Sequence, residues 1–168
     1  LLNETQNCAF GKQVMGSRLG GTLLKDDISA SNVPIATYQV LVSDSSRFVF
    51  AFGTNEIFTT TLDPMLIRWS DQENMVNWTP SATNQAGFLR LSKGSEIIVA
   101  QQSRQEILVW TDVALYSLQY VDGTIVWGSQ LVGDNISIAG PKATAHIDGA
   151  SYWMGSTGFY SYDGTVKS

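Results

Sequence analysis

The sequence predicts an all-β protein, and two observations carry the prediction. Short segments rich in β-branched and aromatic side chains recur from residue 37 onward, with turn-forming pairs between them. No stretch holds the 3.6-residue apolar period of an amphipathic helix over about ten residues. The expected strands are residues 37–43, 47–52, 96–100, 105–111, 113–120 and 124–128.

Turn chemistry marks the ends of these strands. An Asp-Gly pair between apolar alternations predicts a hairpin, because both residues tolerate the positive φ of tight turns. The turn pairs are Ser43-Asp44, Lys93-Gly94, Asp122-Gly123, Gly133-Asp134, Asp148-Gly149 and Asp163-Gly164. Residues 1–36 differ, because glycine, aspartate and serine pairs make them a loop-rich lead-in to the strand-forming region 37–168.

The strand-forming region repeats itself. Residues 110–118 and 154–162 both predict a strand ending in a large side chain, a tight turn, and a strand opening with two bulky residues and serine. Residues 52–60 are a looser third copy. Units of roughly 40–50 residues with several strands each are typical of propeller blades. We therefore expect about three blade-like units of one propeller-like domain; a β-sandwich or jelly roll is the alternative.

The expected number of units and the composition both suggest a piece of a larger assembly. Three units are too few to close a ring of ~4–8 blades, so we expect a fragment of a larger protein. Charged residues make up only 15% of the chain, whereas roughly a quarter is usual, which indicates either a surface covered by partners or a chain that is part of something larger. The net charge of -5 argues against a nucleic-acid-binding surface. The single cysteine, Cys8, excludes an internal disulfide framework and a Cys-based zinc site.

The most distinctive segment is a polar loop at residues 70–77, flanked by Trp69 and Trp78. Its acids and amides are side chains that bond their own backbone, so we expect them to cap the turn locally. We expect the two tryptophans to fasten the loop to a neighbouring blade or subunit. The interface candidates are therefore Trp69, Trp78, Asp71 and Glu73.

Each pattern that could indicate catalysis is explained better by an ordinary structural role. Asp71 and Glu73 could form a carboxylate pair for glycoside hydrolysis, but two acids so close in a loop are more often turn-capping. His146 has Asp148 and Ser151 nearby, yet no Gly-x-Ser-x-Gly elbow is present. The glycines form neither a dinucleotide fingerprint nor a Walker A loop. We therefore expect no enzyme and no catalytic, cofactor-binding or metal residues.

Several segments together resemble the virion structural proteins of tailed bacteriophages. They are residues 62–74, 78–84, 94–97, 105–112 and 152–155, and the likeness covers roughly residues 38–165. Some of those proteins are similar to the tail tubular or nozzle component of short-tailed phages. That resemblance implies propeller-like sheets and assembly as a ring under the portal and adaptor. It implies no catalytic residues.

We therefore expect a structural component of a phage tail, located in the virion. It would associate with itself as a ring, six-fold by analogy, contact adaptor or fibre proteins, and surround the DNA exit channel. DNA would pass without specific binding, since an acidic lumen repels the duplex. No apolar run reaches the ~18 residues of a membrane helix, so membrane insertion is not expected. The alternative function is a carbohydrate-binding or sialidase-like propeller for host recognition, which a clustered aromatic–acid pocket would favour.

Overall fold

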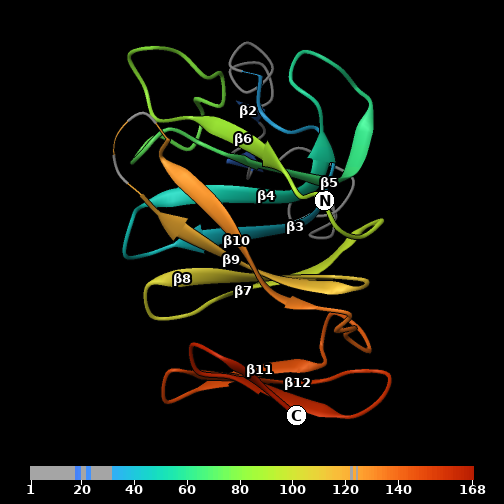
Figure 1. The fold of residues 1–168 in the computed structure, drawn as a ribbon. Helices are drawn as coiled ribbons and strands as arrows, with labels where there is room; N and C mark the ends of the chain where they lie inside the picture. Colours follow the sequence, from blue (N-terminus) through green and yellow to red (C-terminus); the bar gives the residue numbers. More distant parts are fainter. Residues whose placement is uncertain (1–17, 20–21, 24–31, 122, 124) are drawn as a thin grey trace. The chain divides into compact units, whose positions relative to one another are not determined.

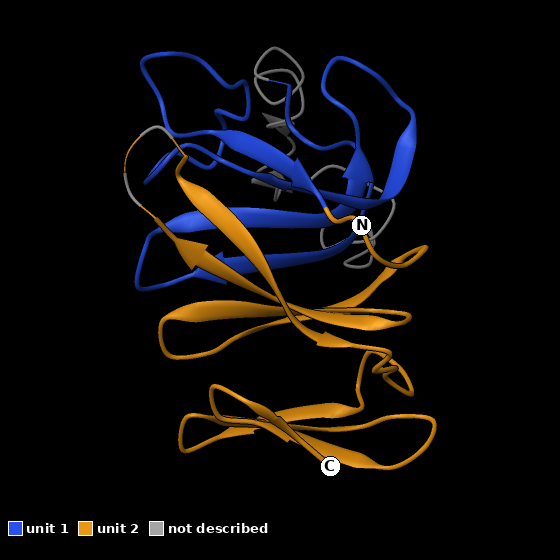
Figure 2. Ribbon diagram, viewed as in Figure 1, with its two compact units in different colours: residues 1–90 blue, residues 91–168 orange. Residues whose placement is uncertain are grey.

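The computed structural model describes residues 18–19, 22–23, 32–121, 123 and 125–168. Within those residues every regular element is a β-strand, and the strands form three antiparallel four-stranded sheets and one two-stranded pair. The all-β prediction is therefore confirmed. The chain divides into two compact units, residues 1–90 and 91–168 (Figure 2). Most of the predicted lead-in at residues 1–36 lies outside the described residues.

Each four-stranded sheet is built from four strands that are consecutive along the chain (Figure 1). The first sheet, in unit 1, contains β3 (Thr37–Ser43), β4 (Phe48–Asn55), β5 (Leu62–Trp69) and β6 (Gly87–Arg90). The second sheet, in unit 2, contains β7 (Ile97–Gln102), β8 (Glu106–Thr111), β9 (Ala114–Tyr120) and β10 (Trp127–Asp134). The third sheet, also in unit 2, contains β11 (Thr144–Ile147), β12 (Ala150–Met154), β13 (Phe159–Tyr162) and β14 (Val166–Lys167). The two-stranded pair is β1 (Arg18–Leu19) with β2 (Thr22–Leu23).

The three copies of the sequence repeat occupy the same place in their sheets. Residues 52–60 span the turn between β4 and β5, residues 110–118 that between β8 and β9, and residues 154–162 that between β12 and β13. The copies at 110–118 and 154–162 are the hairpins that join the second and third strands of their sheets, so their matching residues occupy matching positions. The looser copy at 52–60 covers the end of β4 and the turn, and it stops before β5 begins.

Strand β5 was not among the predicted strands, and Pro64 is the physical reason. A proline lacks the N–H that a sheet ladder needs, so a strand usually tolerates it only at an edge or a bulge. The β4–β5 register shifts between Phe52 and Thr54, and Pro64 lies opposite that irregularity. Gly53 occupies the same irregularity with φ +59, and the Tyr38 ring lies so close that a Cβ would come within 2.4 Å of it. Regular pairing is interrupted at this bulge, so it accommodates both Pro64, which has no N–H to donate, and Gly53, which has a positive φ.

The turn predictions hold at three hairpins and fail at one site. Turns at Ser43-Asp44, Asp148-Gly149 and Asp163-Gly164 join β3–β4, β11–β12 and β13–β14. The turn predicted at Gly133-Asp134 is wrong, because both residues belong to β10 at a register shift. A Cβ at Gly133 would lie 2.4 Å from Ile136 Cδ1, so the glycine permits a close approach of side chains and not a reversal of the chain. Asp122 lies outside the described residues.

Each unit has its own aromatic core. In unit 1, Phe48, Phe50 and Phe52 line one face of β4 and are all fully buried, with the last two rings stacked at 5.9 Å. In unit 2, the second and third sheets pack through a cluster in which Trp110 meets Trp153 edge-on at 5.5 Å. Trp110, Trp127 and Trp153, the three tryptophans of unit 2, are all buried.

Candidate functional site

The polar loop after β5 is closed by its own side chains. Asp71 Oδ1 accepts hydrogen bonds from the backbone N–H groups of Gln72 at 3.0 Å and Gln85 at 2.9 Å. The amide oxygen of Asn74 accepts the N–H of Val76 at 3.2 Å. The bonds to Gln72 and Val76 are the short-range side-chain-to-backbone bonds expected of Asp and Asn in turns, whereas the bond to Gln85 joins the loop to a residue 14 positions away. The predicted local capping is therefore confirmed for these residues.

The two tryptophans of the loop are core residues of unit 1. Trp78 is fully buried against Val33 and Ala51, and its indole N–H donates to the Met75 carbonyl at 2.7 Å. Trp69 is 5% exposed and donates to the Gln85 carbonyl at 2.9 Å. This differs from the expected interface role at another subunit. The indoles fasten the loop to its own sheet, because burying the rings there also satisfies each ring N–H.

The other two interface candidates do not form a catalytic pair. Asp71 is engaged with backbone N–H groups, whereas Glu73 forms an ion pair with Arg47. Both side chains of that pair are more than half exposed, so it contributes little to stability. The exposed side chains of the loop are therefore those of Glu73, Asn74 and Met75.

His146 and Ser151 do meet, as a cross-strand pair. His146 on β11 lies opposite Ser151 on β12, with 2.9 Å between Nδ1 and Oγ. Ser151 is fully buried, so its hydroxyl cannot reach a substrate. Asp148 forms the turn between the two strands. The contact is that of a structural sheet pair.

Arg68 on β5 is a buried cation that no motif in the sequence singles out. It is fully buried, and its guanidinium donates to the carbonyls of Asn55 at 3.3 Å, Trp78 at 3.4 Å and Asn32. Burial lowers the pKa of Arg68 from its ordinary value to about 10. A planar group with five N–H donors suits this task, because it can bond carbonyls from separate segments at once. Arg68 thus ties the Trp78 loop and residue 32 to the sheet.

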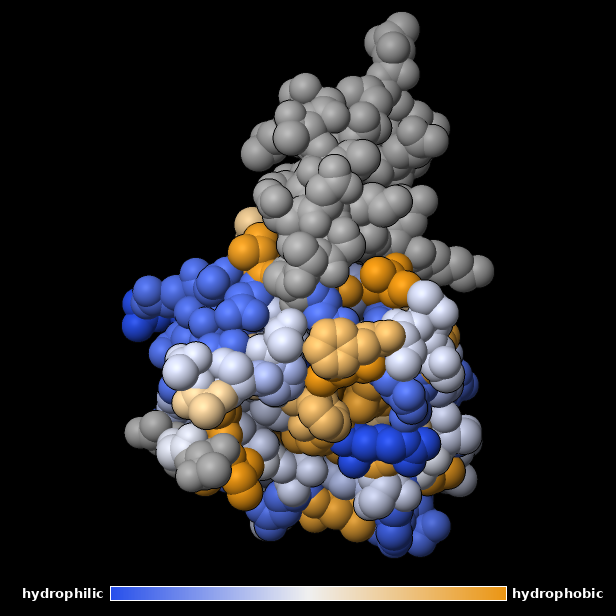
Figure 3. Space-filling model, turned by 90° about the horizontal axis from the view of Figure 1, so that it is seen from above, coloured by the Kyte–Doolittle hydropathy of each residue, from blue (hydrophilic) through white to orange (hydrophobic). Residues whose placement is uncertain are grey.

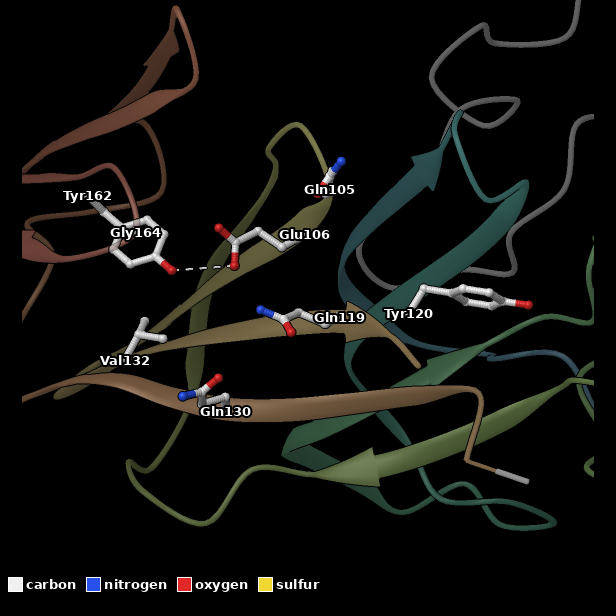
Figure 4. A pocket seen from close by; sticks show the side chains of 8 residues that line it. All are labelled: Gln105, Glu106, Gln119, Tyr120, Gln130, Val132, Tyr162 and Gly164. Atoms are coloured by element: carbon white, nitrogen blue, oxygen red, sulfur yellow. Dashed lines mark hydrogen bonds between the residues drawn. The ribbon is translucent and has the colours of Figure 1, made fainter. Parts of the chain in front are cut away.

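Unit 2 contains a polar groove of about 680 Å³. Its lining residues are Gln105, Glu106, Gln119, Tyr120, Gln130, Val132, Tyr162 and Gly164. Glu106, Gln119 and Gln130 stand on the neighbouring strands β8, β9 and β10, and Tyr162 approaches from the third sheet (Figure 4). The same face of the second sheet is apolar further along, where Trp110 and Leu115 are packed in the core.

The centre of the polar groove is a hydrogen-bonded carboxylate. Glu106 Oε2 accepts the hydroxyl of buried Ser117 and, at 3.5 Å, the phenolic hydroxyl of Tyr162. Burial first, and the Glu106 carboxylate second, raise the pKa of Tyr162 above its usual value. Tyr162 therefore stays a neutral donor at physiological pH. The glutamine amides beside it can both donate and accept, which suits the hydroxyl groups of a ligand.

The lining of the groove limits what it can bind. None of its lining residues is a lysine or arginine, so the groove offers no counter-charge to an anion. Over the described residues, no three His, Cys, Asp or Glu side chains gather as a metal centre would require. In the same part of the chain, no helix has the length and apolar character needed to cross a membrane. The chemistry on offer is hydrogen bonding to a neutral, hydroxyl-bearing molecule.

Comparison with known proteins does not place the chain in a family. No protein-family model matches it, and no curated protein matches it significantly. The class that the fold itself defines is an all-β protein built from a repeated four-stranded antiparallel sheet.

Proposed function

We propose that the chain is a structural subunit of a bacteriophage tail, forming part of a ring or nozzle in the virion. The observation that carries the proposal is the repetition of one four-stranded sheet three times in succession, with the repeated hairpin in the same place each time. Successive four-stranded sheets of this kind are the units from which propellers are built. The resemblance of residues 38–165 to tail proteins supports the same conclusion.

The surface suits a mechanical role in an assembly. Several large apolar side chains are exposed, among them Phe58 at 79% and Phe88 at 54%. On the face seen in Figure 3, hydrophobic patches lie among hydrophilic ones, as at the contact surfaces of assembled proteins. The net charge of -5 disfavours adhesion to DNA, which passes through the channel. The proposed partners are further copies in a ring, six by analogy, and adaptor or fibre proteins.

Immunogold electron microscopy tests the proposal. Antibodies raised against the purified chain should label the tail of phage particles whose genome encodes it. Antibody absorbed beforehand with the pure chain is the control and should leave the particles bare. A structural role is contradicted if infected cells contain the protein but purified particles bind no antibody and contain no peptides from this chain.

Recognition of host-surface carbohydrate is a second candidate function, and the polar groove favours it. The groove joins a carboxylate, glutamine amides and aromatic residues, the mixture that binds sugar hydroxyl groups and ring faces. Because its lining carries no cation, neutral sugars fit better than sialosides, which departs from the sialidase-like alternative.

A glycan array followed by calorimetry tests the second candidate. Binding of a neutral glycan should weaken about tenfold or more in Glu106→Gln, since a charge-assisted hydrogen bond contributes roughly 1.5–3 kcal/mol. Glu73→Gln, in the other unit, is the matched control and should bind normally. Absence of any glycan ligand, or equal losses in both variants, removes this candidate.

A further inference from the structure

The polar groove of unit 2 contains a carboxylate without a counter-charge. Glu106 is the one charged residue in its lining, and it forms no ion pair with any described residue. Its Oε2 atom accepts the hydroxyl groups of Ser117 and Tyr162, whereas no described residue bonds its other oxygen, Oε1 (Figure 4). Half-buried charge of this kind is costly until a group of opposite charge pairs with it.

Two glutamine amides lie beside this carboxylate. The register pairs Glu106 directly with Gln119, and it pairs Gln130 with Ser117, the residue two positions before Gln119 on β9. Alternate residues of a strand share one face, and directly opposed side chains lie about 4.5–5.5 Å apart at Cβ. The carboxylate and both amides therefore form one patch. Each amide adds an oxygen that accepts hydrogen bonds and an amino group that donates them.

The carboxylate is held in place before any ligand arrives. Ser117 is fully buried and Tyr162 is 6% exposed, so both of the hydroxyl groups that bond Oε2 come from packed side chains. They use one oxygen of Glu106 and leave the other to a ligand. Prior ordering of this kind lowers the entropy that binding costs. The groove volume of about 680 Å³ lies within the range of small-molecule sites.

We infer that the groove binds an amino sugar, whose protonated amino group pairs with Glu106 while its hydroxyl groups bond the glutamine amides. An ammonium group has three N–H donors and no acceptor, so it suits Oε1 and the neighbouring amide oxygens. A neutral sugar satisfies the amides but leaves the carboxylate without a counter-charge. A sugar acid brings a second negative charge, which the carboxylate repels.

This inference rests on carbohydrate recognition, the second candidate function, and names the class of sugar that the groove prefers. Titration of the chain with D-glucosamine and D-glucose, followed by NMR, tests it. At about pH 6 the amine is protonated and the carboxylate is ionised. The side-chain amide signals of Gln119 and Gln130 report binding at the groove itself.

The wild type should bind glucosamine about fivefold or more tightly than glucose, because a hydrogen bond between charged groups is roughly twice as strong as a neutral one. Glu106→Gln should bind the two sugars equally. Glu73→Gln, in the other unit, is the control and should keep the preference. Butylammonium, which has the charge but no hydroxyl groups, should bind the wild type more weakly than glucosamine does.

Circular dichroism establishes that each variant is folded. If Glu106→Gln is not, Gln119→Lys takes its place, since it sets a permanent ammonium group opposite Glu106 and should remove the preference for glucosamine. Equal binding of both sugars by the wild type overturns the inference, as does a preference that survives in the groove variant. So does butylammonium that binds as tightly as glucosamine.

The outcomes separate this inference from the functions proposed above. If glucose and glucosamine bind equally, the amino group plays no part, but carbohydrate recognition stands. If neither sugar shifts the amide signals up to about 50 mM, the amino-sugar inference is wrong, and the glycan array alone then decides whether the groove binds other carbohydrates. The tail role is decided in every case by the antibody labelling.

Discussion

Truncation of Trp78 is the sharpest test of the loop after β5. Trp78 is fully buried in unit 1, and replacing a buried tryptophan by alanine costs about 3–5 kcal/mol. The lost hydrogen bond adds little, because Met75 is 60% exposed and water can reach its carbonyl. For a chain of this size each kcal/mol shifts the melting temperature by roughly 2–4 °C, so Trp78→Ala should melt about 6–20 °C lower.

Differential scanning calorimetry provides the measurement, and Glu73→Ala provides the control. Glu73 is exposed and its ion pair with Arg47 is solvated, so its loss should change stability by no more than ~0.5 kcal/mol. Trp78→Phe keeps most of the packing and should fall between the two. If Trp78→Ala melts within about 2 °C of the wild type, the loop is a free arm in solution and our account of its packing is wrong.

Three further predictions concern the charged and titrating groups. Burial tends to raise the pKa of Asp112, but hydrogen bonds from the Ser95 hydroxyl and backbone outweigh burial and lower the pKa. The stability that this carboxylate contributes is therefore present at pH values above its ordinary pKa of 3.8 and is lost as the pH falls through the lowered pKa. Ser95→Ala should move the Asp112 pKa upward in an NMR titration, and an unchanged value would contradict the contact. Glu106→Gln should lower the pKa of Tyr162 towards its usual value in an ultraviolet titration, with Tyr162→Phe identifying the signal; no movement would show that Glu106 does not contact the phenol. Arg68→Lys should lower the melting temperature, since an ammonium group cannot span the carbonyls that the guanidinium joins, and an unchanged melting curve would refute that bonding role.

The sequence predicted what depends on local chemistry. Strand β3 coincides with its predicted range, and β4, β7, β8 and β9 each begin one residue later than predicted, because alternation and turn residues act over a few positions. The missed strand β5 contains Pro64, which is tolerated because the β4–β5 register is irregular there, with residues 64–66 of β5 facing Gly53 alone. Whether a glycine makes a turn or a close contact, as at Gly133, depends on a neighbour that the local pattern does not reveal.

The candidate sites could be predicted only in part, because they depend on distant residues. Asp71 caps its own loop, and this follows from its residue type and place in the sequence. Glu106 and Tyr162 meet although 56 positions separate them, and no motif links the two. The sequence predicted that the tryptophans beside the loop contact a partner, but the sheet on which an indole packs decides where it is buried. Trp78 packs on the sheet of its own unit.

The covering of Ala51 by Trp78 has a consequence for how copies of the chain can accumulate. A protein with two exposed, mutually complementary sheet faces on opposite sides invites end-to-end addition, and such addition does not close, so fibres form. The indole of Trp78 covers the face of the first sheet on which Ala51 lies. A variant that displaces Trp78 would uncover this face, so it should be examined for insoluble fibrils as well as for lower stability.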